Sequence, residues 1–304
     1  MGKDEEKSAF YSFLETLSGK KIYFEKMAGN NGDQLITLGA EYLLQKCECR
    51  RMRAPEGAEY ILINGGNTND TWRGRVDKLA YYRRRYPAIP LIVAPSSFRF
   101  RGIDFRQTCL INDSPFILFA RERYSADILR KIDLPSCVRV EVSQDLAFEL
   151  RETDSIRALR EKTSEKHILI AMRRDKEGPA GILTRTHASW LPQCVRKPLS
   201  KLRDRLTSYI SNDVVKEVIR QEGIPQGVPR IYRDVAEALS FEEFVDVICN
   251  SERIITDRLH VAILGFLLSK KVILIAREDH KVKGVYGLSM SGANSRTILW
   301  EVEN

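Results

Sequence analysis

The chain has 304 residues, with 43% hydrophobic and 30% charged residues, a composition that excludes fibrous and largely disordered proteins. The length is sufficient for two domains with full hydrophobic cores. A formal net charge of +8 indicates an anionic ligand or an anionic surface as partner.

Short apolar strands alternate with helical patterns in the first half of the chain. We expect strands at 21–27, 61–63, 91–93, 117–119 and 138–142, and helices at 34–46, 75–86 and 125–132. Such alternation predicts βαβ units and a mainly parallel sheet.

A highly charged stretch at 151–166 indicates a domain boundary, which divides the chain into domains 1–155 and 156–304. The second domain contains a basic, loop-rich insertion at 178–235, with a helical stretch near 203–221. Strands are expected at 167–172, 254–255 and 272–275, and helices at 241–249 and 257–268. The first of these helices has Ser240 and Glu243 at the spacing of a capping box.

Two glycine-containing polar segments follow the first two strands. Gly29-Asn30-Asn31-Gly32-Asp33 allows a ligand to approach backbone N–H groups, but Asp33 is also placed to cap a helix beginning at Gln34. Asn64-Gly65-Gly66-Asn67-Thr68-Asn69-Asp70 is compatible with a plain turn or with a site at the sheet edge, where open α/β sheets bind ligands.

Arginines follow three further strands, at Arg121, Arg173 and Arg258. An arginine at a strand end is commonly exposed, but three meeting at one site would suit a ligand with a phosphate and a carboxylate. His260 is the one histidine of four that follows an aspartate and an arginine at a helix start, where it could exchange a proton near neutral pH. Asp257 is expected to cap that helix.

Taken together, these segments resemble the polysaccharide pyruvyl transferase family. The resemblance rests on Gly29–Asp33, Asn64–Asn67, Ala120–Ser125, Gln144–Phe148, Met172–Arg174 and, above all, Thr256-Asp257-Arg258-Leu259-His260. It implies an α/β protein of two Rossmann-like domains with mainly parallel sheets facing across a cleft, similar to the GT-B architecture. The N-terminal domain would be the acceptor side and the C-terminal domain the phosphoenolpyruvate side.

The resemblance also implies a reaction, in which the pyruvyl group of phosphoenolpyruvate is transferred to two sugar hydroxyls as a cyclic ketal. The expected catalytic residues are His260 as general acid, Asp33 for the acceptor hydroxyl, and Arg258. The expected substrate-binding residues are Arg121, Arg173, Arg258, Asn31, Gly32, Asn67, Ser125 and Lys281. Phosphoenolpyruvate is expected as co-substrate, with no other cofactor and no metal.

The setting that we expect is exopolysaccharide or cell-wall glycan biosynthesis in the cytoplasm. The N-terminal residues 1–8 lack the apolar core of a signal peptide, no apolar run approaches the ~20 residues of a membrane span, and the six cysteines indicate reduced thiols. Arginines interleaved with phenylalanines between Arg83 and Arg106 would contact anionic lipid at the inner membrane face if the acceptor is a lipid-linked oligosaccharide. Nucleic acid is not an expected partner.

Two alternatives remain open at this point. The first is a glycosyltransferase of the same architecture that uses a nucleotide sugar, and the second is a non-catalytic scaffold protein of a polysaccharide-assembly complex. The sequence leaves the acceptor sugar and the oligomeric state open.

Overall fold

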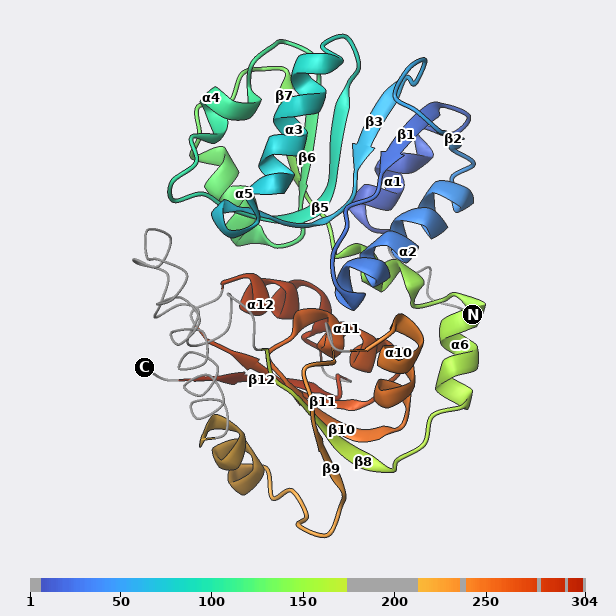
Figure 1. Ribbon diagram of the computed structural model, residues 1–304, viewed down its shortest axis with the longest axis vertical. Coiled ribbons are helices and arrows are strands. Elements are labelled where there is room, and N and C mark those ends of the chain that lie inside the picture. The colour runs from blue at the N-terminus through green and yellow to red at the C-terminus, as the bar shows by residue number, and fades with distance from the viewer. Residues whose placement is uncertain (1–6, 174–212, 236–238, 278–279, 293–294, 303–304) are drawn as a thin grey trace, which may run out of the picture. The chain divides into compact units, whose positions relative to one another are not determined.

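The structure, a computed structural model, describes residues 7–173, 213–235, 239–277, 280–292 and 295–302 (Figure 1). The chain forms two compact units. The first contains Met1–Arg157 and Asp279–Gly292, and the second contains Ala158–Glu278 and Ala293–Asn304.

In the first unit a seven-stranded parallel sheet is formed by the described residues. Its strands are β1 (Lys21–Glu25), β2 (Arg50–Met52), β3 (Tyr60–Ile63), β4 (Gly66–Asn69), β5 (Leu91–Arg99), β6 (Phe116–Ala120) and β7 (Val138–Val142). Its helices are α1 (Ala9–Glu15), α2 (Asn31–Lys46), η1 (Asp70–Trp72), α3 (Arg73–Arg85), α4 (Phe105–Cys109), α5 (Arg123–Arg130), η2 (Leu146–Leu150), α12 (His280–Val285) and η3 (Tyr286–Met290), and α6 (Asp154–Glu161) spans the boundary between the units.

The strand order of this sheet is β2-β1-β3-β5-β6-β7, with β4 paired to the end of β5. The order reverses direction between β1 and β3, so this is the topological switch point of a doubly wound sheet. Ligands of such sheets bind beside the carboxyl ends of the strands at that point. The polar segments that follow β1 and β3 therefore stand where the topology favours a ligand.

Two hydrophobic cores cover the two faces of this sheet, because side chains alternate along each strand. One face packs against α3, α4 and α5, and the other packs against α1 and α2 (Figure 1). Gly39 lies where α2 meets η2, and a Cβ atom there would stand 1.9 Å from the carbonyl oxygen of Leu146. Only a glycine allows α2 to approach this closely.

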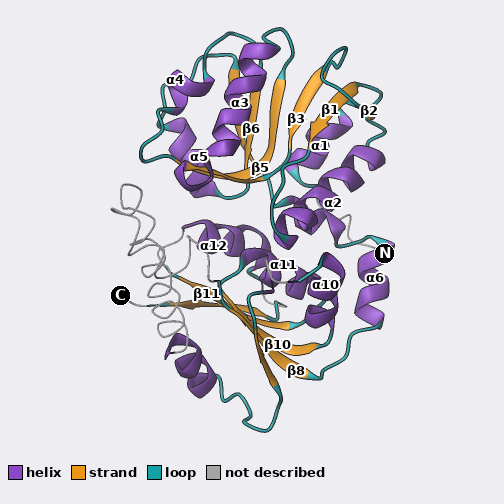
Figure 2. Ribbon diagram, viewed as in Figure 1, coloured by secondary structure: helices purple, strands orange, loops and turns teal. Residues whose placement is uncertain are grey.

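The described residues of the second unit form a five-stranded parallel sheet of β8 (His167–Ala171), β9 (Arg230–Tyr232), β10 (Ser251–Thr256), β11 (Lys271–Ala276) and β12 (Thr297–Glu301). The strand order β12-β11-β10-β8-β9 repeats the pattern of the first sheet. Its switch point falls between β8 and β10, which are followed by Arg173 and Asp257. Helices α10 (Phe241–Cys249) and α11 (Leu259–Leu267) also belong to this unit (Figure 2).

The predicted α/β class with two mainly parallel sheets is confirmed. Helix α10 has the predicted capping box, in which Ser240 and Glu243 each bond the other's backbone N–H. Of the predicted insertion at 178–235, residues 213–221 are helical and 230–232 form β9. Residues 178–212 lie outside the described part.

The segment after β3, for which a plain turn was one of two interpretations of the sequence, contains a short strand. Gly66–Asn69 forms β4, which pairs in parallel with Ser96–Arg99. Gly66 has φ +134°, a conformation that favours glycine, and it redirects the chain into this strand. A second difference lies near the C-terminus, where α12 packs with α5 in the first unit although its sequence lies within the predicted second domain.

Within the described residues, no helix has both the length and the apolar character needed to cross a membrane.

Candidate functional site

The segment after β1 is organised by a capping box. Asn30 is the N-cap residue of α2, and its side chain accepts a hydrogen bond from Gly32 N at 2.8 Å. Asp33 Oδ2 accepts from Asn30 N at 3.0 Å. The prediction that Asp33 is the cap residue of a helix beginning at Gln34 is therefore wrong, because the helix begins three residues earlier and Asp33 is its third residue. The acidic side chain in the first turn still favours the helix.

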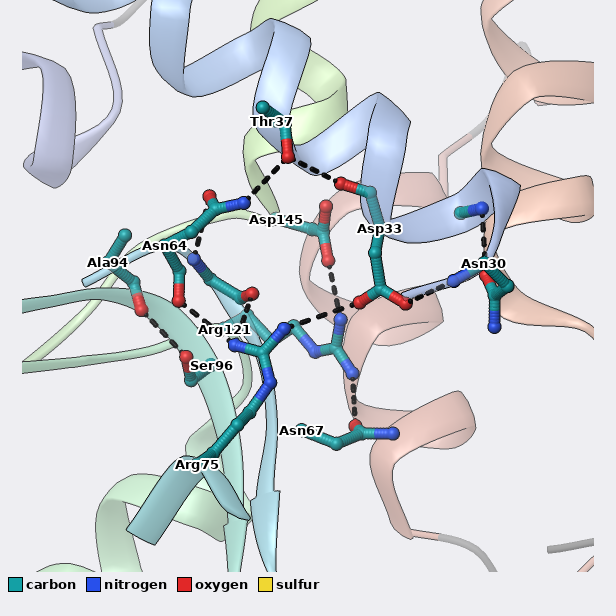
Figure 3. Close-up of polar contacts among 12 residues, drawn as sticks. Asn30, Asp33, Thr37, Asn64, Asn67, Arg75, Ala94, Ser96, Arg121 and Asp145 are labelled. Carbon is teal, nitrogen blue, oxygen red and sulfur yellow. Dashed lines mark hydrogen bonds and ion pairs between the residues drawn. The ribbon is translucent and has the colours of Figure 1, made fainter. Parts of the chain in front are cut away.

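Arg75 of α3 joins the segments that follow β1 and β3. Its Nη1 donates to the carbonyl oxygens of Asn64 at 3.0 Å and Gly65 at 2.7 Å, and its Nη2 donates to Asp33 Oδ1 at 3.3 Å (Figure 3). A Cβ atom on Gly66 would stand 2.5 Å from Nη2. Burial lowers the pKa of Arg75 to about 10, against the opposing effect of Asp33. Arg75 thus fixes the switch point of the first unit.

Arg121 is buried at the end of β6, with 1% of its surface exposed. Nε donates to Ser97 Oγ at 2.9 Å, Nη1 to Asp145 Oδ2 at 2.8 Å, and Nη2 to Asn67 Oδ1 at 2.7 Å. Figure 3 shows the guanidinium between Asp145 and Asn67. Asp145 Oδ1 also accepts from Ala147 N at 2.9 Å, which caps η2. All three nitrogen positions of Arg121 are therefore engaged within the protein.

The end of β6 continues into α5 through a buried carboxylate. Glu122 is the N-cap residue of α5 and accepts from Ser125 N at 2.7 Å, and Ser125 Oγ also bonds its other carboxylate oxygen. Ser125 Oγ accepts from Phe98 N at 2.7 Å, so this side chain ties α5 to β5. Burial raises the pKa of Glu122. Gly284 of α12 lies against Glu122, and Lys281 of the same helix is buried.

At the switch point of the second unit, Asp257 follows β10 and is buried. Its Oδ1 accepts from the backbone N–H of Arg173 at 2.7 Å, which links the ends of β10 and β8. Thr256 Oγ1 donates to Ala171 O at 2.6 Å and strengthens the same link. Burial raises the pKa of Asp257, while nearby Arg173, Arg258 and Arg277 oppose the shift.

The predicted cap role of Asp257 is wrong. Helix α11 begins at Leu259 with Arg258 as its N-cap residue, and the Arg258 side chain makes no capping hydrogen bond. Asp257 instead accepts a hydrogen bond from the backbone N–H of Arg173, which follows the neighbouring strand β8.

Arg258 forms a buried, bidentate ion pair in the second unit. Nε donates to Asp234 Oδ1 at 3.0 Å and Nη2 donates to Asp234 Oδ2 at 2.6 Å. His260 lies two residues further along, in the first turn of α11, and is partly buried. Arg173, Asp257, Arg258 and His260 are thus gathered at the carboxyl edge of one sheet.

The predicted basic and aromatic surface between Arg83 and Arg106 is largely internal. Arg83 is buried, and its guanidinium donates to the carbonyl oxygens of Cys109, Asn112 and Ser114. The phenylalanines Phe98 and Phe105 belong to the core. Arg99 ends β5 and is only partly exposed, whereas Arg106 follows the buried Phe105 on the exposed side of α4. The exposed cations of this region are Arg84, Arg85, Arg101 and Arg106.

Sequence reasoning overlooked four residues that the structure adds: Arg75, Asp145, Asp234 and Arg277. Asp145 lies in a segment that contributed to the family resemblance, but it was given no role. Asp234 lies in the insertion that matched no motif, and Arg75 is one of several arginines on a basic helix. Within the described residues, no cluster of three His, Cys, Asp or Glu side chains is suited to hold a metal ion.

The family model for polysaccharide pyruvyl transferase matches residues 30–280 of this chain. No curated protein matches this chain. Among solved structures, an uncharacterised protein of Klebsiella pneumoniae subsp. pneumoniae has a TM-score of 0.61 at 15% identity, covering 96% of each chain. That similarity shows the fold.

Two UDP-GlcNAc 2-epimerases are also similar in part. The enzyme of Neisseria meningitidis has a TM-score of 0.39 at 14% identity, covering 87% of this chain and 84% of its own. The enzyme of Methanocaldococcus jannaschii has 0.38 at 15% identity, covering 90% and 72%.

Proposed function

The chain belongs to the polysaccharide pyruvyl transferase family, and from this premise we propose that it transfers the pyruvyl group of phosphoenolpyruvate to two hydroxyls of a sugar as a cyclic ketal. The glycan would be an exopolysaccharide or a cell-wall polymer. The acceptor would be presented in the cytoplasm, free or linked to a lipid.

The observation that carries the proposal is the set of cationic side chains at the switch point of the second unit. Arg173, Arg258 and Arg277 lie near the buried Asp257. The carboxylate of Asp257 also accepts a hydrogen bond from the backbone N–H of Arg173. Phosphoenolpyruvate has a carboxylate and a phosphate, and guanidinium groups bind both. Arg258 is held in place by Asp234, so its position is fixed before the donor binds.

His260 would act as the general acid of the reaction. Its proton passes to the methylene carbon of the donor, which becomes a methyl group, and positive charge develops at C2. A sugar hydroxyl forms a bond to C2 and loses its proton, the bond from C2 to the phosphate oxygen breaks, and inorganic phosphate leaves. The second hydroxyl then bonds C2 and loses its proton, which completes the ketal.

The acceptor would bind to the first unit, beside the ends of β1 and β3. Asn31 and Gly32 lie at the beginning of α2, and Asn67 lies in β4. Asp33 would orient an acceptor hydroxyl. We assign Arg121 and Ser125 a positioning role, because their side chains are engaged within the protein.

Lys281 would complete the set of charged residues in the first unit. It belongs to α12, which packs with α5 and is therefore tied to the same unit as Arg121 and Ser125.

Peripheral membrane contact is proposed for the remaining exposed cations, Arg84, Arg85, Arg101 and Arg106. Such contact is electrostatic and would weaken with rising ionic strength. Binding to anionic vesicles at low salt, compared with neutral vesicles, measures it directly.

The experiment that tests the reaction uses phosphoenolpyruvate labelled with ¹³C at C2 and a glycan fraction as acceptor. The labelled carbon should appear as a ketal carbon by NMR, together with released phosphate. His260→Gln should reduce turnover by about 10²-fold or more, as expected for loss of a general acid, while still binding phosphoenolpyruvate.

His167→Gln is the matched control, because His167 begins β8 at the opposite edge of the same sheet and bonds Val247 O. It should retain turnover. Unchanged turnover in His260→Gln would refute the assigned acid, and label that never leaves phosphoenolpyruvate would refute the reaction.

A further inference from the structure

Arg277 directly follows β11 and stands at the carboxyl edge of the second sheet. Strands β10 and β11 run parallel, with Thr256 paired to Leu274, so the residues after both strands emerge on the same side. Asp257 and Arg277 are close enough for the carboxylate to affect the guanidinium. Arg277 therefore belongs to the same site as Asp257.

The guanidinium of Arg277 has unused donors. Its Nε and Nη2 atoms are buried and have no hydrogen-bond partner among the residues that the structure describes. Leaving such donors unpaired away from water costs free energy, and the cost is larger for charged groups. Buried unpaired groups in native structures therefore need an explanation.

The neighbouring Arg258 provides the contrast. Its Nε and Nη2, the same two atoms, are both bonded to Asp234. Arg258 and Arg277 thus follow adjacent strands. Nε and Nη2 of Arg258 bind a carboxylate, whereas the same two atoms of Arg277 bind none within the described part of the chain. Nε and Nη2 form one edge of the guanidinium, and their N–H groups are placed to donate two parallel hydrogen bonds to two oxygens of a carboxylate or phosphate.

We propose that Arg277 is a specificity-determining residue of this site, which binds two oxygens of an anionic group of the donor through Nε and Nη2. The inference rests on the proposed function, because it identifies the anion with the carboxylate or the phosphate of phosphoenolpyruvate. Asp257 balances part of the charge of Arg277 until the donor is present. Arg258, which already has a carboxylate partner, contributes mainly as a fixed positive charge.

The test is calorimetric titration of the full chain with phosphoenolpyruvate, for the wild type, Arg277→Gln and Arg277→Lys. Both variants should weaken binding by at least tenfold, because lysine retains the charge but not the paired donors. Arg296→Gln is the control, since Arg296 is exposed and precedes β12 at the opposite edge of the sheet. It should bind as the wild type does.

A second measurement separates ligand binding from a purely structural role. Arg277→Gln should unfold at the same temperature as the wild type or a higher one without ligand, because it removes unpaired buried donors, and it should lose the stabilisation that phosphoenolpyruvate gives. Titration with inorganic phosphate identifies the group that Arg277 binds. Phosphate binding that is weakened in the variant assigns Arg277 to the phosphate, and unchanged phosphate binding assigns it to the carboxylate.

The two proposals fail in different ways. Wild-type affinity in Arg277→Gln would overturn the role of Arg277 and leave the proposed function in place. A wild-type chain that neither binds phosphoenolpyruvate nor transfers its pyruvyl group would overturn both.

Discussion

Two buried ion pairs, Arg121–Asp145 and Arg258–Asp234, fix charged side chains at the carboxyl ends of strands in the two sheets. In each pair the arginine follows a strand and the aspartate comes from a different segment. Each pair connects two segments that are separated in sequence. Because a buried charge without a partner is strongly destabilising, loss of either residue of a pair should destabilise the fold.

Replacing Arg121 by Met should strongly destabilise the first unit. The substitution leaves Asp145 buried without its cation and removes the bonds to Ser97 and Asn67, so the free energy of unfolding should fall by roughly 3–5 kcal/mol. Denaturant unfolding measures the change. Arg106→Met is the control, because the Arg106–Asp133 pair is exposed and should cost at most about 1 kcal/mol. Equal effects of the two substitutions would contradict the positioning role of Arg121.

Glu122 should make stability depend on pH. Burial raises its pKa in the folded chain, so above the usual glutamate range the folded state binds more protons than the unfolded state. Stability from this group is then highest at low pH and falls as the pH rises through the folded pKa. Unfolding of the wild type and Glu122→Gln, compared from about pH 4.5 upward, should show the variant gaining relative stability with rising pH. A pH-independent difference would show that Glu122 does not titrate in this way.

Residue types at strand ends were predictable, but their partners were not. The sequence places Arg121 and Arg258 after strands, and both positions are correct. Their carboxylate partners lie 24 residues away in each case, in segments whose place depends on tertiary folding. The roles of Asp33 and Asp257 were misassigned for a similar reason, since a cap residue and a residue one to three positions away look alike in sequence.

At the scale of elements, close packing of α2 depends on Gly39. A methyl group there would collide with the backbone of Leu146, so Gly39→Ala should destabilise by about 1–3 kcal/mol through overpacking. Gly74 of α3 is the matched helical glycine, with nothing near its absent Cβ. Gly74→Ala should be neutral or stabilising by up to about 1 kcal/mol, because alanine favours helix. Thermal unfolding of both variants checks the contrast, and a stable Gly39→Ala chain would refute it.

Elements with strong apolar patterns were predicted well, including β3, β6, β8 and the capped helix α10. Strand β4 was missed because its sequence, Gly66–Asn69, is polar and glycine-containing. It forms a strand because the end of β5 offers it backbone partners. Likewise, no local signal in α12 indicates that it packs with α5, since that arrangement depends on the return of the chain to the first unit.

At the scale of the whole molecule, both units have the same strand order, with the switch point next to the first strand of each sheet. The segments that support the family resemblance fall largely at these two switch points, which is why the sequence could indicate them without knowledge of the fold. The polar network of the first unit is anchored by Arg75 and Arg121, and that of the second by Asp257 and Arg258. Family membership makes the chain a transferase, and the arginines of the second unit support an anionic donor.

The most direct test of the central claim is thermal unfolding of the wild-type chain with phosphoenolpyruvate, with uridine diphosphate, and without ligand. A ligand at about 100 times its dissociation constant stabilises by roughly 2.7 kcal/mol. We predict a higher unfolding temperature with phosphoenolpyruvate and no change with the nucleotide. Stabilisation by uridine diphosphate alone would contradict the account and indicate a nucleotide-sugar donor instead.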